Sequence, residues 1–99
     1  MDNELSFERK DNRLCLKGVL TFATVPSLLQ QQDALLAYAE ELEVDLQFLT
    51  KSDSAGIALL IAWTRQLRNE QRSITFLNVP KQLRTMARVS GLESILPLA

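Results

Sequence analysis

The feature that most constrains the fold is the alternation of two hydrophobic periodicities along the chain. Apolar residues recur at every second position in some stretches, which is typical of strands. In the stretches between them they recur at every third or fourth position, which is typical of helices. The chain has 99 residues, enough for one domain but not for two. We therefore expect one domain over residues 1–99 in which strands and helices alternate.

The expected order of elements is strand, strand, helix, strand, helix, strand, helix. The strands are expected at residues 5–8, 13–17, 43–49 and 73–77, and the helices at about residues 24–41, 54–71 and 79–91. Strand–helix–strand connections favour right-handed crossovers, which place the helices against the sheet. We expect an α/β fold with a mixed sheet of four to five strands and helices packed mainly on one face. The strand at residues 43–49 should be central.

Composition argues against several classes of function. Eleven basic and twelve acidic side chains give a net charge of −1, whereas non-specific binding to nucleic acid needs a clear cationic excess. The absence of histidine excludes a Ser-His-Asp triad, a Cys-His pair and the commonest zinc sites. Glycine occurs only at positions 18, 56 and 91, so the chain has no glycine-rich phosphate loop. We expect no catalytic activity, no cofactor, no metal and no nucleic-acid partner.

The sequence also predicts where the protein works. Its polar start does not resemble a signal peptide. The longest run without a polar residue, residues 55–63, is far shorter than the ~18–20 residues needed to cross a bilayer. Cys15 has no partner for an internal disulfide, which indicates a reducing compartment, and we expect it to be a small buried side chain rather than a reactive thiol. We expect a soluble cytoplasmic protein without direct insertion into a membrane.

The segment with the most unusual chemistry is residues 50–60, where a strand is followed by a helix, a position where open α/β sheets place functional loops. Either Asp53 or Ser54 can cap the helix that follows. Capping alone is one explanation of the pair. The other is that Ser54 presents its hydroxyl to a protein partner or a kinase. A phosphate there would be stabilised by the free amides and would place about two negative charges beside Asp53.

The helix in this segment is apolar nearly all round in its first two turns. One face is the expected core stripe, made of Ile57, Leu60, Ile61, Thr64 and Leu67. Leu59 and Trp63 fall outside that stripe, so we expect them to be exposed and to contact a partner, since Trp often anchors interfaces. The alternative is that Trp63 folds over the edge of the domain. Ala58 and Ala62 lie on a third flank, near Ser54.

Charge is unevenly distributed along the chain. Residues 1–53 carry five basic and ten acidic side chains, a net charge of −5, and residues 54–99 carry six basic and two acidic, a net charge of +4. Arg65, Arg68 and Arg72 recur at helical spacing, and Arg84 and Arg88 are four residues apart. These arginines form either a solvated face or a basic rim that pairs with an acidic patch on a partner.

Residues 53–60, DSAGIALL, resemble the signature of the STAS domain, the domain of sulfate transporters and anti-sigma-factor antagonists. The likeness extends to the segments at residues 17–20 and 77–80 and to Leu83, Gly91 and Leu92. It implies a mixed sheet with helices mainly on one side. It further implies that Ser52, Asp53, Ser54 and Gly56 form a partner-binding site and possible phosphorylation switch. The helical pattern described above adds an expected partner interface made of Ala58, Leu59, Ala62, Trp63 and Arg65.

Two subfamilies imply two functions. In anti-sigma-factor antagonists the serine matching Ser54 is phosphorylated by a partner kinase, which blocks binding. In the MlaB-type subunits of phospholipid transporters, the STAS protein binds the ATPase subunit of an ABC complex. The residues after the motif (58–61) and the ending at residues 92–97 favour the MlaB type, and with it a cytoplasmic protein held peripherally at the inner membrane by its partner. Ser54 itself favours the antagonists, because the MlaB type often has Thr there. A nucleotide-binding STAS module lacks support from any phosphate loop.

Overall fold

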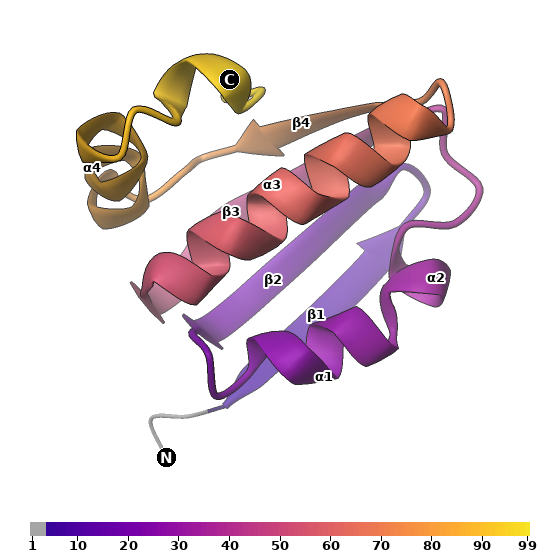
Figure 1. Cartoon of the computed structure of the whole chain (residues 1–99). Coiled ribbons are helices and arrows are strands. Elements are labelled where there is room, and N and C mark those ends of the chain that lie inside the picture. Colours follow the sequence, from indigo (N-terminus) through magenta and orange to yellow (C-terminus); the bar gives the residue numbers. More distant parts are fainter. Residues whose placement is uncertain (1–3) are drawn as a thin grey trace.

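A computed structural model describes residues 4–99 of the chain (Figure 1). Its elements are β1 (Leu5–Lys10), β2 (Arg13–Leu20), α1 (Val25–Gln30), α2 (Gln32–Leu35), β3 (Glu41–Ser52), α3 (Ser54–Asn69), β4 (Ser73–Leu77), α4 (Lys81–Val89) and the 3-10 turn η1 (Glu93–Ile95). The alternation predicted from the two periodicities is confirmed. Only the first helical segment differs from its prediction in kind, because it holds two short helices in place of one long helix.

The four strands form one mixed sheet in the order β1-β2-β3-β4. β1 and β2 are an antiparallel hairpin, and β3 lies between β2 and β4, parallel to both. The expected fold class and the central place of the third strand are therefore confirmed. On the outer edge of β4, Leu98 forms a parallel bridge to Phe76, and the Phe76 N–H donates to the carbonyl of Pro97 at 2.9 Å. This short bridge covers part of the β4 edge.

The core lies between the sheet and the helices. Leu14, Val44 and Phe76 are register partners on β2, β3 and β4, and all three are fully buried. Figure 1 shows α1 and α3 side by side over the same face of the sheet, as expected. α4 adds Leu83 and Ala87 to the same core cluster. Alternate strand residues therefore face the helices, while the opposite face carries polar groups such as the Arg13–Glu43 ion pair at 3.0 Å.

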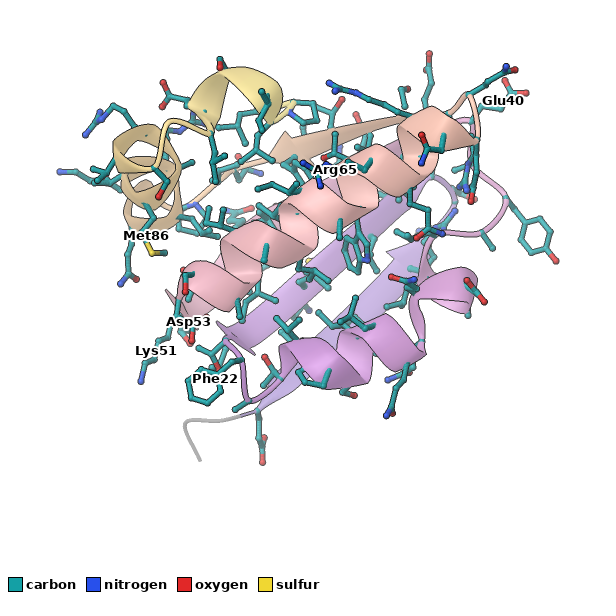
Figure 2. All side chains as sticks on the ribbon, viewed as in Figure 1. Phe22, Glu40, Lys51, Asp53, Arg65 and Met86 are labelled. Carbon is teal, nitrogen blue, oxygen red and sulfur yellow. The ribbon has the colours of Figure 1, made fainter. Side chains whose placement is uncertain are left out.

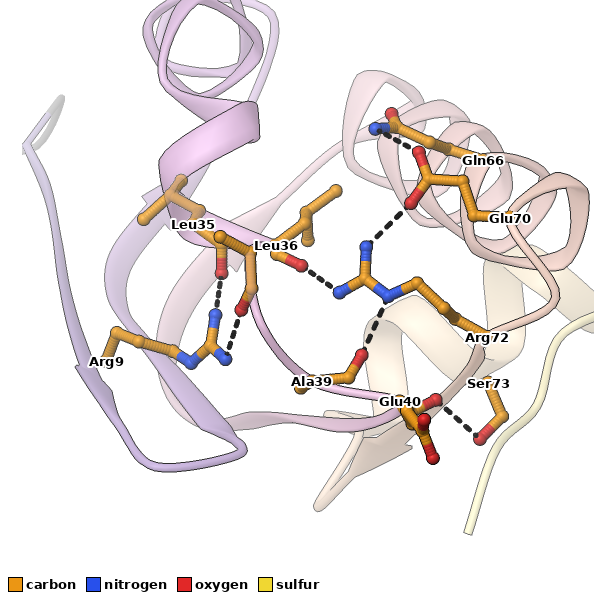
Figure 3. A network of polar contacts seen from close by, with 10 residues as sticks. Arg9, Leu35, Leu36, Ala39, Glu40, Gln66, Glu70, Arg72 and Ser73 are labelled. Atoms are coloured by element: carbon orange, nitrogen blue, oxygen red, sulfur yellow. Dashed lines mark hydrogen bonds and ion pairs between the residues drawn. The ribbon is translucent and has the colours of Figure 1, made fainter.

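The predicted four-turn helix at residues 24–41 is wrong. The segment instead holds two short helices, α1 and α2, and the chain then turns through Tyr38, whose φ is +61°. The chain can leave the helical path because two arginines from other parts of the chain donate hydrogen bonds to carbonyls that helix amides would otherwise have paired (Figure 3). Arg9 donates to the carbonyls of Leu35 and Ala37 at 2.5 and 2.6 Å.

Arg72 is the second of these arginines, and its position fits neither the solvated face nor the basic rim that its spacing suggested. It follows the end of α3, and its guanidinium donates to the carbonyl of Leu36 and, at 2.7 Å, to that of Ala39. Glu70 pairs with the same guanidinium at 2.7 Å, and this hydrogen bond lowers the pKa of the Glu70 carboxyl. Arg72 therefore stabilises the turn before β3 rather than facing a partner.

The third strand is longer than predicted. The polar residues 50–52, expected as a loop, continue β3 because their backbone pairs with the end of β2, with Lys51 opposite Val19 and Ser52 opposite Leu20. The strand continues through these polar residues because their backbone groups still form the parallel hydrogen-bond ladder with β2. The helix that follows begins at Ser54, as expected.

The predicted exposure of Leu59 and Trp63 is also wrong. Leu59 is 2% exposed and Trp63 is completely buried. The indole N–H of Trp63 donates to Oε1 of Gln32, in α2, at 3.3 Å. The short helices α1 and α2 lie beside α3, so α3 buries a second flank in addition to the stripe that faces the sheet. Ile61, expected in the core, is only partly buried.

Gly91 terminates α4, near the end expected from the sequence. Gly91 has a φ of +72°, the left-handed conformation that glycine adopts without steric cost. Its N–H donates to the Arg88 carbonyl at 3.1 Å and that of Leu92 donates to the Ala87 carbonyl at 2.8 Å. These two bonds are those of a Schellman motif.

Replacing Trp63 tests its place in the core. We expect Trp63→Ala to lower the free energy of unfolding by ~3–5 kcal/mol, because it removes a fully buried aromatic side chain and leaves a cavity. Urea denaturation followed by circular dichroism measures the change. A loss below about 1 kcal/mol would contradict the buried position.

Candidate functional site

Asp53 caps α3 and ties it to the sheet. Its backbone is extended, and its Oδ1 accepts the N–H of Ala55 at 2.8 Å. Its Oδ2 accepts the N–H of Phe22 at 3.2 Å, and its own N–H donates to the carbonyl of Leu20 at 3.2 Å. The capping role expected for Asp53 or Ser54 thus belongs to Asp53. The same side chain also fixes the loop between β2 and α1.

Ser54 is the first residue of α3 and is exposed. Because Asp53 performs the capping, the Ser54 hydroxyl is free for other contacts, and within residues 4–99 the structure gives it no hydrogen bond. The hydroxyl lies at the positive end of the helix dipole, where an added negative charge is stabilised. Capping alone therefore does not account for a serine at this position.

Ser52 and Gly56 are both buried beneath the turn. A Cβ added to Gly56 would lie 3.2 Å from the carbonyl oxygen of Leu20 and 3.1 Å from its Cδ2. Glycine at this position allows α3 to approach the end of β2 closely. These two residues shape the turn that carries Ser54, and neither presents a side chain at the surface.

Of the expected interface on α3, Ala58, Ala62 and Arg65 are exposed. Leu59 and Trp63 lie on the opposite, buried flank. The structure thus divides the expected set into a surface half that continues from Ser54 along the helix and an internal half that holds the helix in place.

A groove opens beside Ser54, between α3 and α4. It has a volume of about 390 Å³ and is mainly apolar. Ser54, Ile57, Ala58, Ile61, Thr85, Met86, Val89, Ser90 and Leu92 line it. Val89 is 80% exposed. We refer to this feature as the α3–α4 groove.

Phe22 is a surface residue that the sequence analysis missed. It is 77% exposed, and its backbone is held by Asp53. Figure 2 shows Phe22, Lys51, Asp53 and Met86 at the same end of the molecule, far from Glu40. Phe22 belongs to neither periodic pattern, so only its position in the loop before a proline-started helix could have drawn attention to it.

The cations of α3 and α4 are largely unneutralised. Among the described residues, Lys81, Arg65, Arg68 and Arg88 make no ion pair, and each is exposed. Arg84 donates to the carbonyl of Ala99 at 3.2 Å. Arg65, Lys81 and Arg88 thus lie on the two helices that form the α3–α4 groove, whereas Arg68 lines a separate hollow beside β4. Two carboxylates, Asp53 and Glu93, adjoin the groove residues Ser54 and Leu92 in the chain.

The remaining chemistry is limited. Cys15, expected to be buried, is only partly buried and lies outside the core. Its partial burial, together with the nearby Asp45 carboxylate, raises the pKa of its thiol, and a protonated thiol is a poor nucleophile. In residues 4–99 no three Cys, Asp or Glu side chains gather as metal ligands would. No helix in that part of the chain is long and apolar enough to cross a membrane.

Comparison with known proteins agrees with the resemblance seen in the sequence. The family model described as "Mlab, STAS domain" matches residues 3–97. No curated protein matches the chain.

Solved structures share the fold. An anti-sigma factor antagonist from Mycobacterium paratuberculosis is 22% identical, with a TM-score of 0.76 over 96% of this chain and 83% of that one. The unphosphorylated anti-sigma factor antagonist SpoIIAA is 17% identical, with a TM-score of 0.71 over 97% and 88%. The phosphorylated Bacillus SpoIIAA, a cell fate determinant, is 18% identical, with a TM-score of 0.69 over 97% and 91%. At these identities the likeness concerns the fold alone.

Gly56 allows a test of the turn. At an open helix position, Gly→Ala stabilises by ~0.5–1 kcal/mol. At this position we expect Gly56→Ala to lower the free energy of unfolding by ~1–3 kcal/mol, because the new methyl crowds Leu20. Urea denaturation measures it, with the exposed Ala58→Gly, expected to lose ~1 kcal/mol, as the control. A stabilised Gly56→Ala variant would contradict the close approach.

Proposed function

The chain belongs to the STAS domain family of the Mlab type, and from this premise we propose that it is a non-catalytic subunit that binds and supports the ATPase subunit of a bacterial ABC transporter. In this proposal the transporter moves phospholipid and so maintains the lipid asymmetry of the outer membrane. The protein would work in the cytoplasm and be held at the inner membrane through its partner.

One observation carries the proposal at the level of residues. Ser54, the motif residue, is exposed at the start of α3 and continues into an exposed face with small side chains, Ala58 and Ala62. Small side chains let the backbone of a partner approach closely, so that its atoms exclude water from the contact. Arg65 ends this face with a charge that can pair with a carboxylate of the partner.

The buried half of the motif supports the same function indirectly. Asp53 and Gly56 fix the first turn of α3 against β2, so the docking face is held in one orientation. A preorganised face loses little conformational freedom on binding. Phe22, fixed beside Asp53, extends the proposed contact with an aromatic side chain, a residue type that often contributes strongly to interfaces.

A second candidate function is that of an anti-sigma-factor antagonist whose partner is a kinase that phosphorylates Ser54. The exposed Ser54 hydroxyl favours it, and so does the likeness in fold to antagonists. A phosphate on Ser54 would be stabilised by the α3 amides but would bring about two negative charges next to Asp53. The phosphorylated domain would stay folded and would lose its partner.

Substitution of Ser54 tests the docking face. We expect Ser54→Glu to weaken binding of the ATPase subunit at least tenfold, because it buries a second carboxylate beside Asp53 in the contact. Ser54→Ala should weaken it less. Ser54→Glu should leave the free domain as stable as the wild type or stabilise it by ~0.3–1 kcal/mol, since a negative charge at a helix N-terminus is favourable.

Isothermal titration with an ABC-transporter ATPase subunit from the same organism measures the affinity, and thermal melting measures the stability of each variant. Equal affinity of Ser54→Glu and the wild type would place the contact elsewhere. The two candidate functions are separated by offering the chain the ATPase subunit or an anti-sigma kinase with ATP. Phosphorylation of Ser54 without binding to the ATPase would favour the antagonist function.

A further inference from the structure

The α3–α4 groove has the features of a binding site that neither the family motif nor Ser54 explains. It is walled by two helices, and Met86 and Val89 of α4 lie outside the motif altogether. We propose that this groove binds an acidic amphipathic helix of the protein partner, with apolar side chains of that helix seated against Met86 and Val89. The inference rests on the proposed function for the identity of that partner.

The apolar lining indicates which atoms the occupant presents. Ile57 and Ile61 form one wall one helical turn apart, and Met86 and Val89 form the other. Ala58 lies on the α3 wall, and its methyl side chain leaves the space open. A flexible methionine adapts to side chains of different shape. Since Val89 is 80% exposed, covering it removes apolar surface from water.

The charged residues around the groove indicate the sign of the charge on the occupant. Arg65 lies seven residues after Ala58, so the two share one line along α3. Arg88 adjoins Val89, and Lys81 precedes Thr85 by one turn on α4. None of these three cations makes an ion pair within residues 4–99. An apolar segment bordered by carboxylates would neutralise them, whereas a basic or neutral segment would leave them unpaired.

The shape of the site favours a helix over an extended strand. A strand would need the edge of a sheet for its backbone hydrogen bonds, but the walls of the groove are two helices whose backbone groups bond within each helix. An amphipathic helix satisfies its own backbone and presents apolar side chains at spacings of three and four residues. Figure 1 shows α4 beside the first half of α3, with the sheet behind.

Ser54 lines the end of the groove, which gives the motif residue a second effect. A negative charge there would repel an acidic occupant as well as crowd the contact. A positive charge at the same position would attract it. The sign of the charge at position 54 should therefore matter more than its bulk.

The first experiment measures binding of the ATPase subunit to the full chain by isothermal titration. We expect Val89→Asp to weaken binding at least tenfold. Tyr38→Asp is the matched control, because Tyr38 is fully exposed at a distant loop and is not part of the groove, and it should bind as the wild type does. Ser54→Lys should bind at least tenfold more tightly than Ser54→Glu. Thermal melting checks that each variant is folded.

The salt dependence supplies an independent readout. The affinity of the wild type should fall between about 50 and 300 mM salt, because ion pairs at the rim are screened. The double variant Arg65→Gln with Arg88→Gln should show a smaller fall. A wild-type affinity that does not change with salt would overturn the proposal that the occupant is acidic.

A photoreactive amino acid in place of Val89 then identifies what lies in the groove. The expected crosslink is to a helical segment of the ATPase subunit with net negative charge. A crosslink to a second copy of this chain, or to a basic segment, would overturn the proposal. Binding that is weakened by Ser54→Glu but not by Val89→Asp would overturn the groove as the binding site while leaving the proposed function intact. An ATPase subunit that does not bind the wild type at all would overturn both.

Discussion

The close contact between Gly56 and Leu20 fixes the position of α3, and most of the molecule depends on it. Because glycine has no side chain, the first turn of the helix approaches the carbonyl of Leu20, and that carbonyl also accepts the N–H of Asp53 at 3.2 Å. The Asp53 side chain then binds the loop that carries Phe22. One packing constraint in the interior thus determines which residues stand together at the surface.

The opposite end of α3 is held by a different kind of interaction. After the helix ends, Arg72 donates to carbonyls of the turn before β3, and Arg9 of β1 donates to carbonyls of the same turn and of α2 (Figure 3). A guanidinium carries five donors in a fixed plane, so two side chains satisfy backbone groups that a continuous helix would have paired internally. Hydrogen bonds from arginine side chains therefore hold the C-terminal end of α3, whereas close packing of Gly56 against Leu20 holds its N-terminal end.

The sequence predicted the features that depend on local chemistry. A helix cap at Asp53 or Ser54 and the alternation of strands and helices follow from residue type and spacing. The exposure of Leu59 and Trp63 could not be predicted in this way, because it depends on where α1 and α2 lie, and helical periodicity describes one helix at a time. The same reason explains Arg72, whose spacing suggested a helix face although the helix ends before it. Ser54 and Ala58, which the sequence singled out, both line the α3–α4 groove, but its second wall on α4 comes from a segment about thirty residues away and could not be found from local pattern.

Restraint at both ends makes α3 a stiff element in a small protein. A stiff face offers the same shape to every molecule that meets it, so recognition does not wait for a rare conformation to be populated. Complexes formed on such a face differ mainly in how long they last, since association requires no rearrangement of this chain and dissociation breaks contacts particular to each complex. The two restraints described above, neither of which lies in the exposed face, thus fix the orientation of that face relative to the sheet.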